Sequence, residues 1–241
     1  MLRSTIRLVL VLLSSFTSYA QPITFQKLIG GSSSTDYVAD VLVTADSGFI
    51  VLGGTGSHGA GNFDIYLVKL NKNGSVIWTK TYGGSKGDSP GRIAQTADSG
   101  FIISGSTVNF NISLDRDLLL LKTNKEGDVQ WSKVLTVSPQ SIYGVAVVQT
   151  ADGGYLVGGD ILSTDKLLLA KLDSTGATVW TKTYGEHNGH WDIRKTADGG
   201  FLILGDTFFS NNRSDNYLMK TDSLGNIQWT KRYQKRPGTS L

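Results

Sequence analysis

The sequence contains no cysteine, only four prolines and only two glutamates among its 241 residues. The absence of cysteine excludes disulfides, thiolate metal sites, a cysteine nucleophile and a lipidated cysteine anchor. Glutamate favours helix interiors, whereas glycine and aspartate favour turns. The chain has 29 glycines, so its scarcity of glutamate beside many turn-forming residues argues against a helical protein.

The first 20 residues have the pattern of a secretory signal peptide. Arg3 and Arg7 precede a short apolar run at residues 8–13, and Ala20 ends a stretch of small residues suited to a signal peptidase. The run is too short to cross about 30 Å of hydrocarbon. We therefore expect cleavage after Ala20 and a secreted or cell-surface protein that begins at Gln21; the alternative is a buried N-terminal strand.

The charge balance of the mature chain excludes two classes of partner. Loss of the two arginines in the leader leaves 21 Lys+Arg against 20 Asp+Glu, a net charge of +1. This leaves no basic field to bind nucleic acid or anionic lipid. No later segment resembles a membrane span, so we expect neither partner.

The rest of the chain repeats one unit four times. The pattern Thr-Ala-Asp-Ser/Gly-Gly-Phe/Tyr begins at Thr44, Thr96, Thr150 and Thr196, with spacings of 52, 54 and 46 residues. Each copy is followed by an apolar run that ends in lysine, a glycine-containing turn, and a tryptophan nine residues after the lysine. The lysines are Lys69, Lys122, Lys171 and Lys220, and the tryptophans are Trp78, Trp131, Trp180 and Trp229.

Each unit is predicted to form four short strands, which in the first unit are residues 37–43, 49–53, 64–70 and 75–82. Asp46 is expected to accept hydrogen bonds from backbone amides just ahead of it, and Gly48 to adopt a positive φ. Four strands in a period near 50 residues are typical of β-propeller blades. The third strand is almost continuously apolar, which indicates a sheet buried on both faces.

The number of predicted strands does not correspond to a closed ring of complete blades. The units span about 36–84, 88–137, 142–185 and 188–234, within a domain of 21–234 that is followed by a short tail at 235–241. Residues 23–31 align with residues 76–84, with Phe25 at the position of Trp78. We therefore expect an all-β, propeller-like array of four four-stranded antiparallel blades plus one extra N-terminal strand, as an open or partial ring. We interpret the chain as a shortened copy of a longer array.

The turn before Trp180 resembles the tryptophan-docking motif of quinoprotein-type β-propellers. The matching residues are Ala170, Asp173, Thr175-Gly176 and Trp180, although Asp173 lies one residue closer to Thr-Gly than that pattern expects. In that family the tryptophan packs between blades, so the resemblance implies a fold and no chemistry. Residues 22–233 also resemble tandem-repeat arrays in secreted and surface proteins of Bacteroidetes-type bacteria and some archaea.

The loops that vary between units are the expected location of a binding site, because recognition usually resides in variable loops on a rigid scaffold. His187 and His190 could ligate a metal with a nearby carboxylate, but spacing fixes no third ligand, and we predict no metal and no cofactor. Trp191 is either a platform for stacking a sugar or a residue that packs the channel mouth. The binding candidates on these loops are His58, Asp88, Arg92, His187, His190, Trp191 and Asp192.

The four repeated lysines are interpreted as structural, since a catalytic group is rarely needed in four copies. Each is predicted to pair with an acid of its own unit, for which the turn aspartate is the candidate, and each pair would contribute about 0.2–1 kcal/mol if exposed. The aspartates are Asp46, Asp98, Asp152 and Asp198.

Two functions remain open. The first is a secreted or surface binding module without catalytic residues, whose candidate partners are a cell-surface glycan, a protein, or another copy of the chain joined through open blade edges. The second is a secreted carbohydrate-active hydrolase that uses variable-loop groups converging in one pocket. Its candidate groups are Asp88, Arg92, His187 and Asp192. The repetition without a unique polar constellation favours the first.

Overall fold

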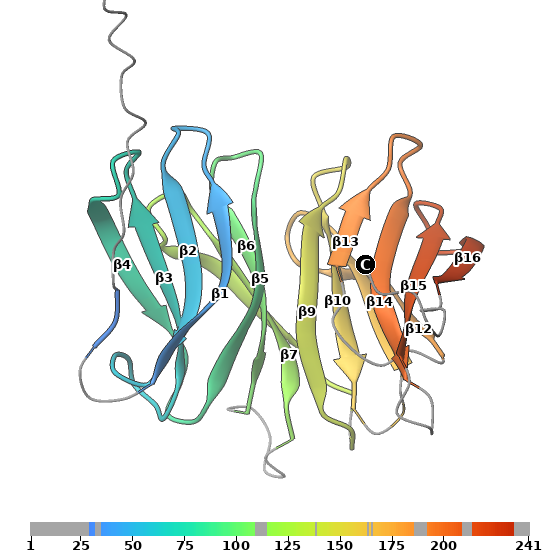
Figure 1. The fold of residues 1–241 in the computed structure, drawn as a ribbon, viewed down its shortest axis with the longest axis horizontal. Helices are drawn as coiled ribbons and strands as arrows, with labels where there is room; N and C mark the ends of the chain where they lie inside the picture. The colour runs from blue at the N-terminus through green and yellow to red at the C-terminus, as the bar shows by residue number, and fades with distance from the viewer. Residues whose placement is uncertain are drawn as a thin grey trace, which may run out of the picture.

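A computed structural model shows an all-β protein (Figure 1). It describes residues 29–31, 35–108, 115–137, 139–162, 164, 166–185, 192–208 and 214–233. Within these residues sixteen strands form four four-stranded antiparallel sheets, with no helix. The predicted propeller-like fold class is confirmed, and the array of sheets is not closed into a ring within the described part of the chain.

Each sheet is one sequence repeat, and we call the four sheets blades 1 to 4. Blade 1 comprises β1 (Asp36–Val43), β2 (Phe49–Thr55), β3 (Asp64–Leu70) and β4 (Val76–Tyr82). Blade 2 comprises β5 (Asp88–Gln95), β6 (Phe101–Thr107), β7 (Asp117–Thr123) and β8 (Val129–Leu135). Blade 3 comprises β9 (Ile142–Gln149), β10 (Tyr155–Ile161), β11 (Lys166–Leu172) and β12 (Thr178–Tyr184). Blade 4 comprises β13 (Asp192–Lys195), β14 (Phe201–Phe208), β15 (Ser214–Thr221) and β16 (Ile227–Tyr233).

The repeated hairpin turn between the first two strands of a blade forms as predicted, with one correction. In blade 1, Asp46 Oδ1 accepts a hydrogen bond from Gly48 N at 3.1 Å. The positive φ belongs to Ser47, at 61°, and not to Gly48. Glycine is required at position 48 for space, because a Cβ there would lie 2.4 Å from the carbonyl oxygen of Leu70.

Neighbouring blades share three apolar cores, one at each junction. Ile50 and Leu67 of blade 1 pack with Phe101 and Ile103 of blade 2, and equivalent clusters join blades 2 and 3 and blades 3 and 4. All seven residues of β7 are buried because both faces of its sheet are covered. The prediction from the continuously apolar third strands is therefore confirmed for the two inner blades, blades 2 and 3.

The tryptophans of blades 1, 2 and 3 each dock onto the next blade. Gly127 lies in the turn between β7 and β8 of blade 2, with a φ of +81°. A Cβ on this residue would lie only 3.0 Å from the Trp78 ring, so the ring packs directly against the backbone of the turn. Tyr82 Oη adds a hydrogen bond to Gly127 O at 2.6 Å. The same contact recurs between Trp131 and Gly176 and between Trp180 and Gly225, where Tyr184 Oη bonds Gly225 O at 2.6 Å.

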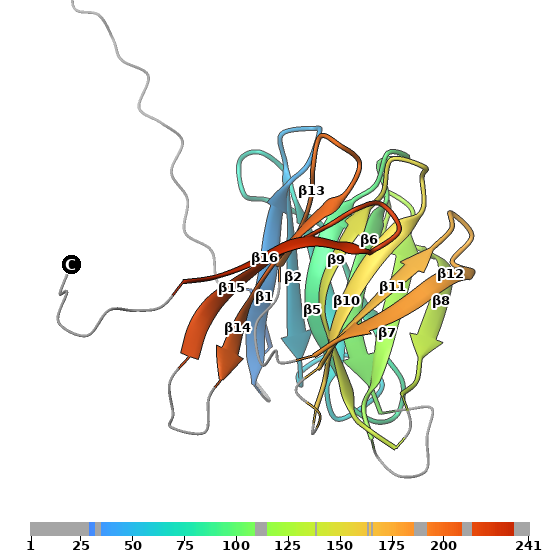
Figure 2. The ribbon, with the colours of Figure 1, turned by 90° about the vertical axis from the view of Figure 1, so that its right-hand side faces the viewer.

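The outer face of blade 4 has no such partner among the described residues. Figure 2 shows blade 4 toward the viewer, with no other sheet in front of it. All seven residues of β16 are exposed, and Trp229 is 40% exposed. Asn216 is exposed at the position that Ile65 occupies, fully buried, in blade 1.

Several predicted features fall outside the described residues. These include the leader and its cleavage site, most of the extra strand at residues 23–31, and the tail at 235–241. These features remain predictions. The described residues contain no helix of the length and apolar character needed to span a membrane.

The docking hydrogen bond can be tested with Tyr82→Phe. This change leaves the carbonyl of Gly127 without its donor and should lower the free energy of unfolding by about 0.5–1.5 kcal/mol. The matched control is Tyr233→Phe at the equivalent position of blade 4, where the side chain is 51% exposed. Urea denaturation should show a loss for the first variant only; equal effects of both would contradict the docking role.

Candidate functional site

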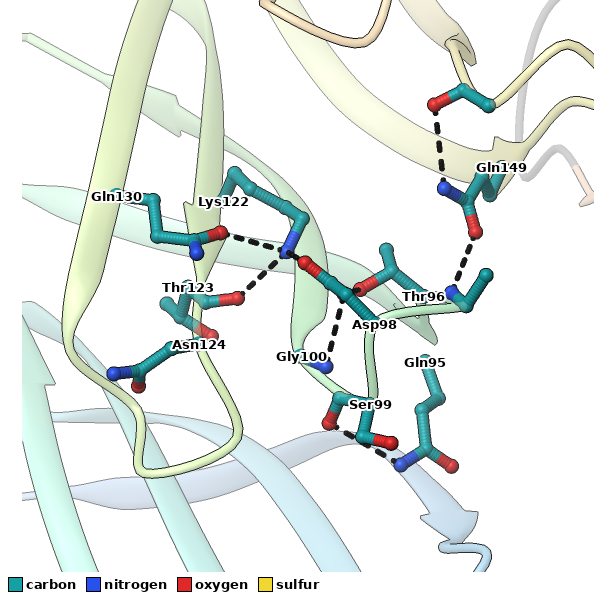
Figure 3. Close-up of polar contacts among 12 residues, drawn as sticks. Gln95, Thr96, Asp98, Ser99, Gly100, Lys122, Thr123, Asn124, Gln130 and Gln149 are labelled. Atoms are coloured by element: carbon teal, nitrogen blue, oxygen red, sulfur yellow. Dashed lines mark hydrogen bonds and ion pairs between the residues drawn. The ribbon is translucent and has the colours of Figure 1, made fainter.

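The repeated lysines form a polar cluster at the end of each blade where the uniform hairpin turns lie. In blade 2 (Figure 3), Lys122 Nζ donates to Asp98 Oδ2 at 2.8 Å, to Thr123 O at 2.8 Å and to Gln130 Oε1 at 2.9 Å. These three bonds use all three ammonium donors. Thr96 Oγ1 also donates to Asp98, so the cluster ties the hairpin turn to the third strand.

The predicted pairing of lysine and turn aspartate is present in all four blades, at 2.8–2.9 Å. The lysines are only 3–8% exposed, whereas the side chains of their aspartate partners are 52–64% exposed, so each pair lies at the boundary between the interior and solvent. Hydrogen bonds from Lys171 and Thr150 lower the pKa of Asp152 to about 2. Complete pairing inside each blade supports a structural role for these residues.

Acid should unfold the protein over a defined pH range. The pKa of each turn aspartate is lowered by folding, so each stabilises the fold above the unfolded pKa of about 3.9. This stabilisation is lost as the pH falls from about 4 toward 2. Urea midpoints should therefore decrease steeply over this range and less steeply in Asp152→Asn. An unchanged pH dependence in the variant would contradict this assignment.

The described binding candidates lie at or near the variable end of the blades, by which we mean the end that carries the loops that vary between units. Each of them contacts different neighbours. His58 stacks on Tyr66, with ring centroids 5.6 Å apart. Arg92 lies within β5 and donates from Nη1 to Ala39 O at 3.0 Å. Asp192 pairs with Arg194 at 2.8 Å. These contacts tie each residue to its own neighbours.

Asp88 has a structural position. It is 2% exposed, and its Oδ2 accepts a hydrogen bond from Gly84 N at 2.8 Å. Such burial prevents direct contact with a sugar or a protein at the surface, so Asp88 does not reach the kind of ligand predicted for the variable loops. His187, His190 and Trp191 lie outside the described residues. Within the described ranges, no group of three or more His, Cys, Asp or Glu side chains could hold a metal ion.

A different cluster, absent from the sequence prediction, joins blades 1, 2 and 3 at the variable end. Tyr37, Ser89 and Tyr143 are each the second residue of their blade's first strand. Contacts between β1 and β5 and between β5 and β9 bring these strands together. Tyr37 is hydrogen-bonded to Ser89, and burial raises the pKa of Tyr37. All three residues occupy the same position of the sequence repeat, and this is the signal in the sequence by which they could have been identified.

Arg116 completes this aromatic–arginine cluster, which we define as Tyr37, Ser89, Arg116 and Tyr143. Its Nη1 donates to Ser89 Oγ at 3.1 Å, and its Cζ lies 5.1 Å from the centroid of the Tyr143 ring. Arg116 forms no ion pair with a carboxylate in the described part of the chain, and it is partly exposed. The guanidinium is therefore held in place without a carboxylate partner among the described residues.

A cavity adjoins this cluster on blade 1. It has a volume of about 450 Å³, and Tyr37, Val41, Val51 and Tyr66 are among its lining residues. Tyr37 is shared by the cluster and the cavity, and its ring also stacks on Phe63 with centroids 5.3 Å apart. A second cavity of about 570 Å³ lies at the opposite, uniform end of the blades, beside Asp46.

Comparison with known proteins supports the fold. No known protein family and no curated protein matches the sequence. A thermostable family-43 glycoside hydrolase is similar in structure, with a TM-score of 0.55 and 9% identity over 83% of this chain and 77% of that one. An endo-1,4-β-xylanase from Bacteroides thetaiotaomicron has a TM-score of 0.51 and 10% identity, over 86% of this chain and 80% of that one. At such identities the likeness shows the propeller-like fold alone.

Proposed function

We propose that the chain is a secreted or cell-surface binding module that takes its ligand at the aromatic–arginine cluster. The observation that carries this proposal is Arg116, a fixed guanidinium with no carboxylate partner among the described residues. Its position at the variable-loop end matches the expected location of recognition on a rigid scaffold.

The chemistry of the cluster favours a ligand with an anionic group and a flat face. A guanidinium presents a planar fork of donors that matches a carboxylate. The rings of Tyr37 and Tyr143 offer apolar faces with hydroxyl groups at their ends. A sugar acid within a glycan has both features, because its carboxylate can meet Arg116 while its ring packs on tyrosine.

The carboxylates of the described residues give little support to the alternative function, a carbohydrate-active hydrolase. A glycosidase needs two carboxyl groups that reach the substrate. Asp64 and Asp88 lie close together, but they are 1% and 2% exposed. The two solved structures compared above are a glycoside hydrolase and a xylanase by title, yet 9–10% identity carries their fold and not their activity. We therefore propose binding without hydrolysis.

Binding can be tested with uronic-acid oligosaccharides and their neutral counterparts. We expect the purified mature chain to bind the acidic series more tightly, and Arg116→Gln to weaken that binding at least tenfold, a loss of about 1.4 kcal/mol. The affinity should also fall as salt is added, because the contact is ionic.

The matched control is Arg194→Gln, which removes the same charge from a side chain that is 72% exposed and paired with Asp192. It should leave the affinity unchanged. Equal losses in the two variants, or equal binding of neutral and acidic sugars, would overturn the proposed site. Release of shorter sugars during incubation would instead favour the hydrolase.

A further inference from the structure

Two buried aspartates meet where the variable loops join blades 1 and 2. Asp64 is the first residue of β3, and Asp88 is the first residue of β5. The loops before them are held together by a hydrogen bond from Asp88 N to Phe63 O at 2.7 Å and by a parallel bridge between Phe63 and Gly87. Both side chains are almost completely shielded from solvent.

The carboxylates of these aspartates converge beside Gly83. A Cβ on Gly83 would lie 1.8 Å from Asp64 Oδ1 and 2.6 Å from Asp88 Oδ2, so the two oxygens are close neighbours. Asp64 Oδ2 accepts hydrogen bonds from Ala60 N at 2.8 Å and Gly61 N at 3.1 Å. Asp64 Oδ1 is buried and has no hydrogen-bond partner.

More oxygen atoms belong to the same pair of loops. The carbonyl oxygens of Gly84 and Lys86 would lie 2.4 and 2.3 Å from a Cβ on Gly61, so only glycine leaves room for them. Buried carboxylates are normally paired with a cation or bound to a metal. An environment of carboxylate and carbonyl oxygens suits a hard cation such as Ca²⁺.

We propose that Asp64 and Asp88 bind one Ca²⁺ ion that joins blade 1 to blade 2. The unpartnered Asp64 Oδ1 supplies the decisive ligand, Asp88 supplies the second carboxylate, and loop carbonyls and water complete the coordination. The ion would offset the repulsion between the two carboxylates and fix the variable loops. The residues of this site differ from those of the aromatic–arginine cluster, which it adjoins through Phe63 and Ser89, and the proposal does not depend on the proposed ligand.

The next junction of the array provides an internal control. Asp117 begins β7 as Asp64 begins β3, and it is equally buried. The residue at the position of Asp88 is Ile142, and Thr136 stands at the position of Gly83. This junction therefore has one carboxylate where the first has two, and it should not hold the ion.

Calcium binding can be measured by titration calorimetry and thermal unfolding of the full mature chain after treatment with a chelator. We expect one Ca²⁺ per chain and a melting temperature about 5–10 °C higher at 100 times the dissociation constant. Asp88→Asn should abolish both effects. Asp117→Asn should retain both, whatever its own effect on stability.

Two further variants keep the test decisive if Asp88→Asn folds poorly. Asp64→Asn removes the unpartnered oxygen, and Gly83→Ala fills the space between the two carboxylates without changing charge. Both should remove the response to Ca²⁺. A wild-type chain that neither binds Ca²⁺ nor melts higher in its presence would overturn the proposal, as would an undiminished response in Asp64→Asn.

Discussion

The docking of a tryptophan ring onto the glycine turn of the next blade is the contact on which the rest of the structure depends. An isolated four-stranded sheet has two faces to cover, and the apolar third strands of this chain cannot be left exposed. Trp78, Trp131 and Trp180 each lie at the outer strand of one blade and contact a turn of the following blade. Together with the shared apolar cores, they fix the spacing and the direction of stacking.

The tryptophan contacts run in one direction along the array, from each blade to the blade that follows it in the sequence. Blade 4 therefore has no following blade among the described residues to receive its tryptophan. Blade 4 repeats the docking residues, but Trp229 and Tyr233 are exposed. Its sequence also departs from the pattern, with Asn216 at a position that is apolar and buried in the other blades. Terminal repeats of stacked arrays commonly carry polar residues on their outer face. Stability should therefore be lower at this end of the array.

The sequence predicted the scaffold well and the candidate site poorly, for physical reasons. The constant nine-residue interval between lysine and tryptophan fixed the strands, because a hairpin of given turn length allows one register. The lysine–aspartate pairs followed from the same repetition, being local to each blade. The positive φ was assigned to Gly48 instead of Ser47, since composition alone does not say which turn position is left-handed. Contacts between blades, such as those of Arg116 and Asp64, depend on how the sheets stack, and variable loops carry no periodic signal.

Amide hydrogen exchange, followed strand by strand in a chain of residues 21–241, tests the role of docking between blades most directly. Exchange reports the free energy of local opening, which should follow how many faces of a sheet are covered. We expect β10 and β11, covered on both faces, to be protected far longer than β14 and β15 of blade 4. Equal protection of these two pairs of strands would show that docking between blades does not control stability, and would contradict the account.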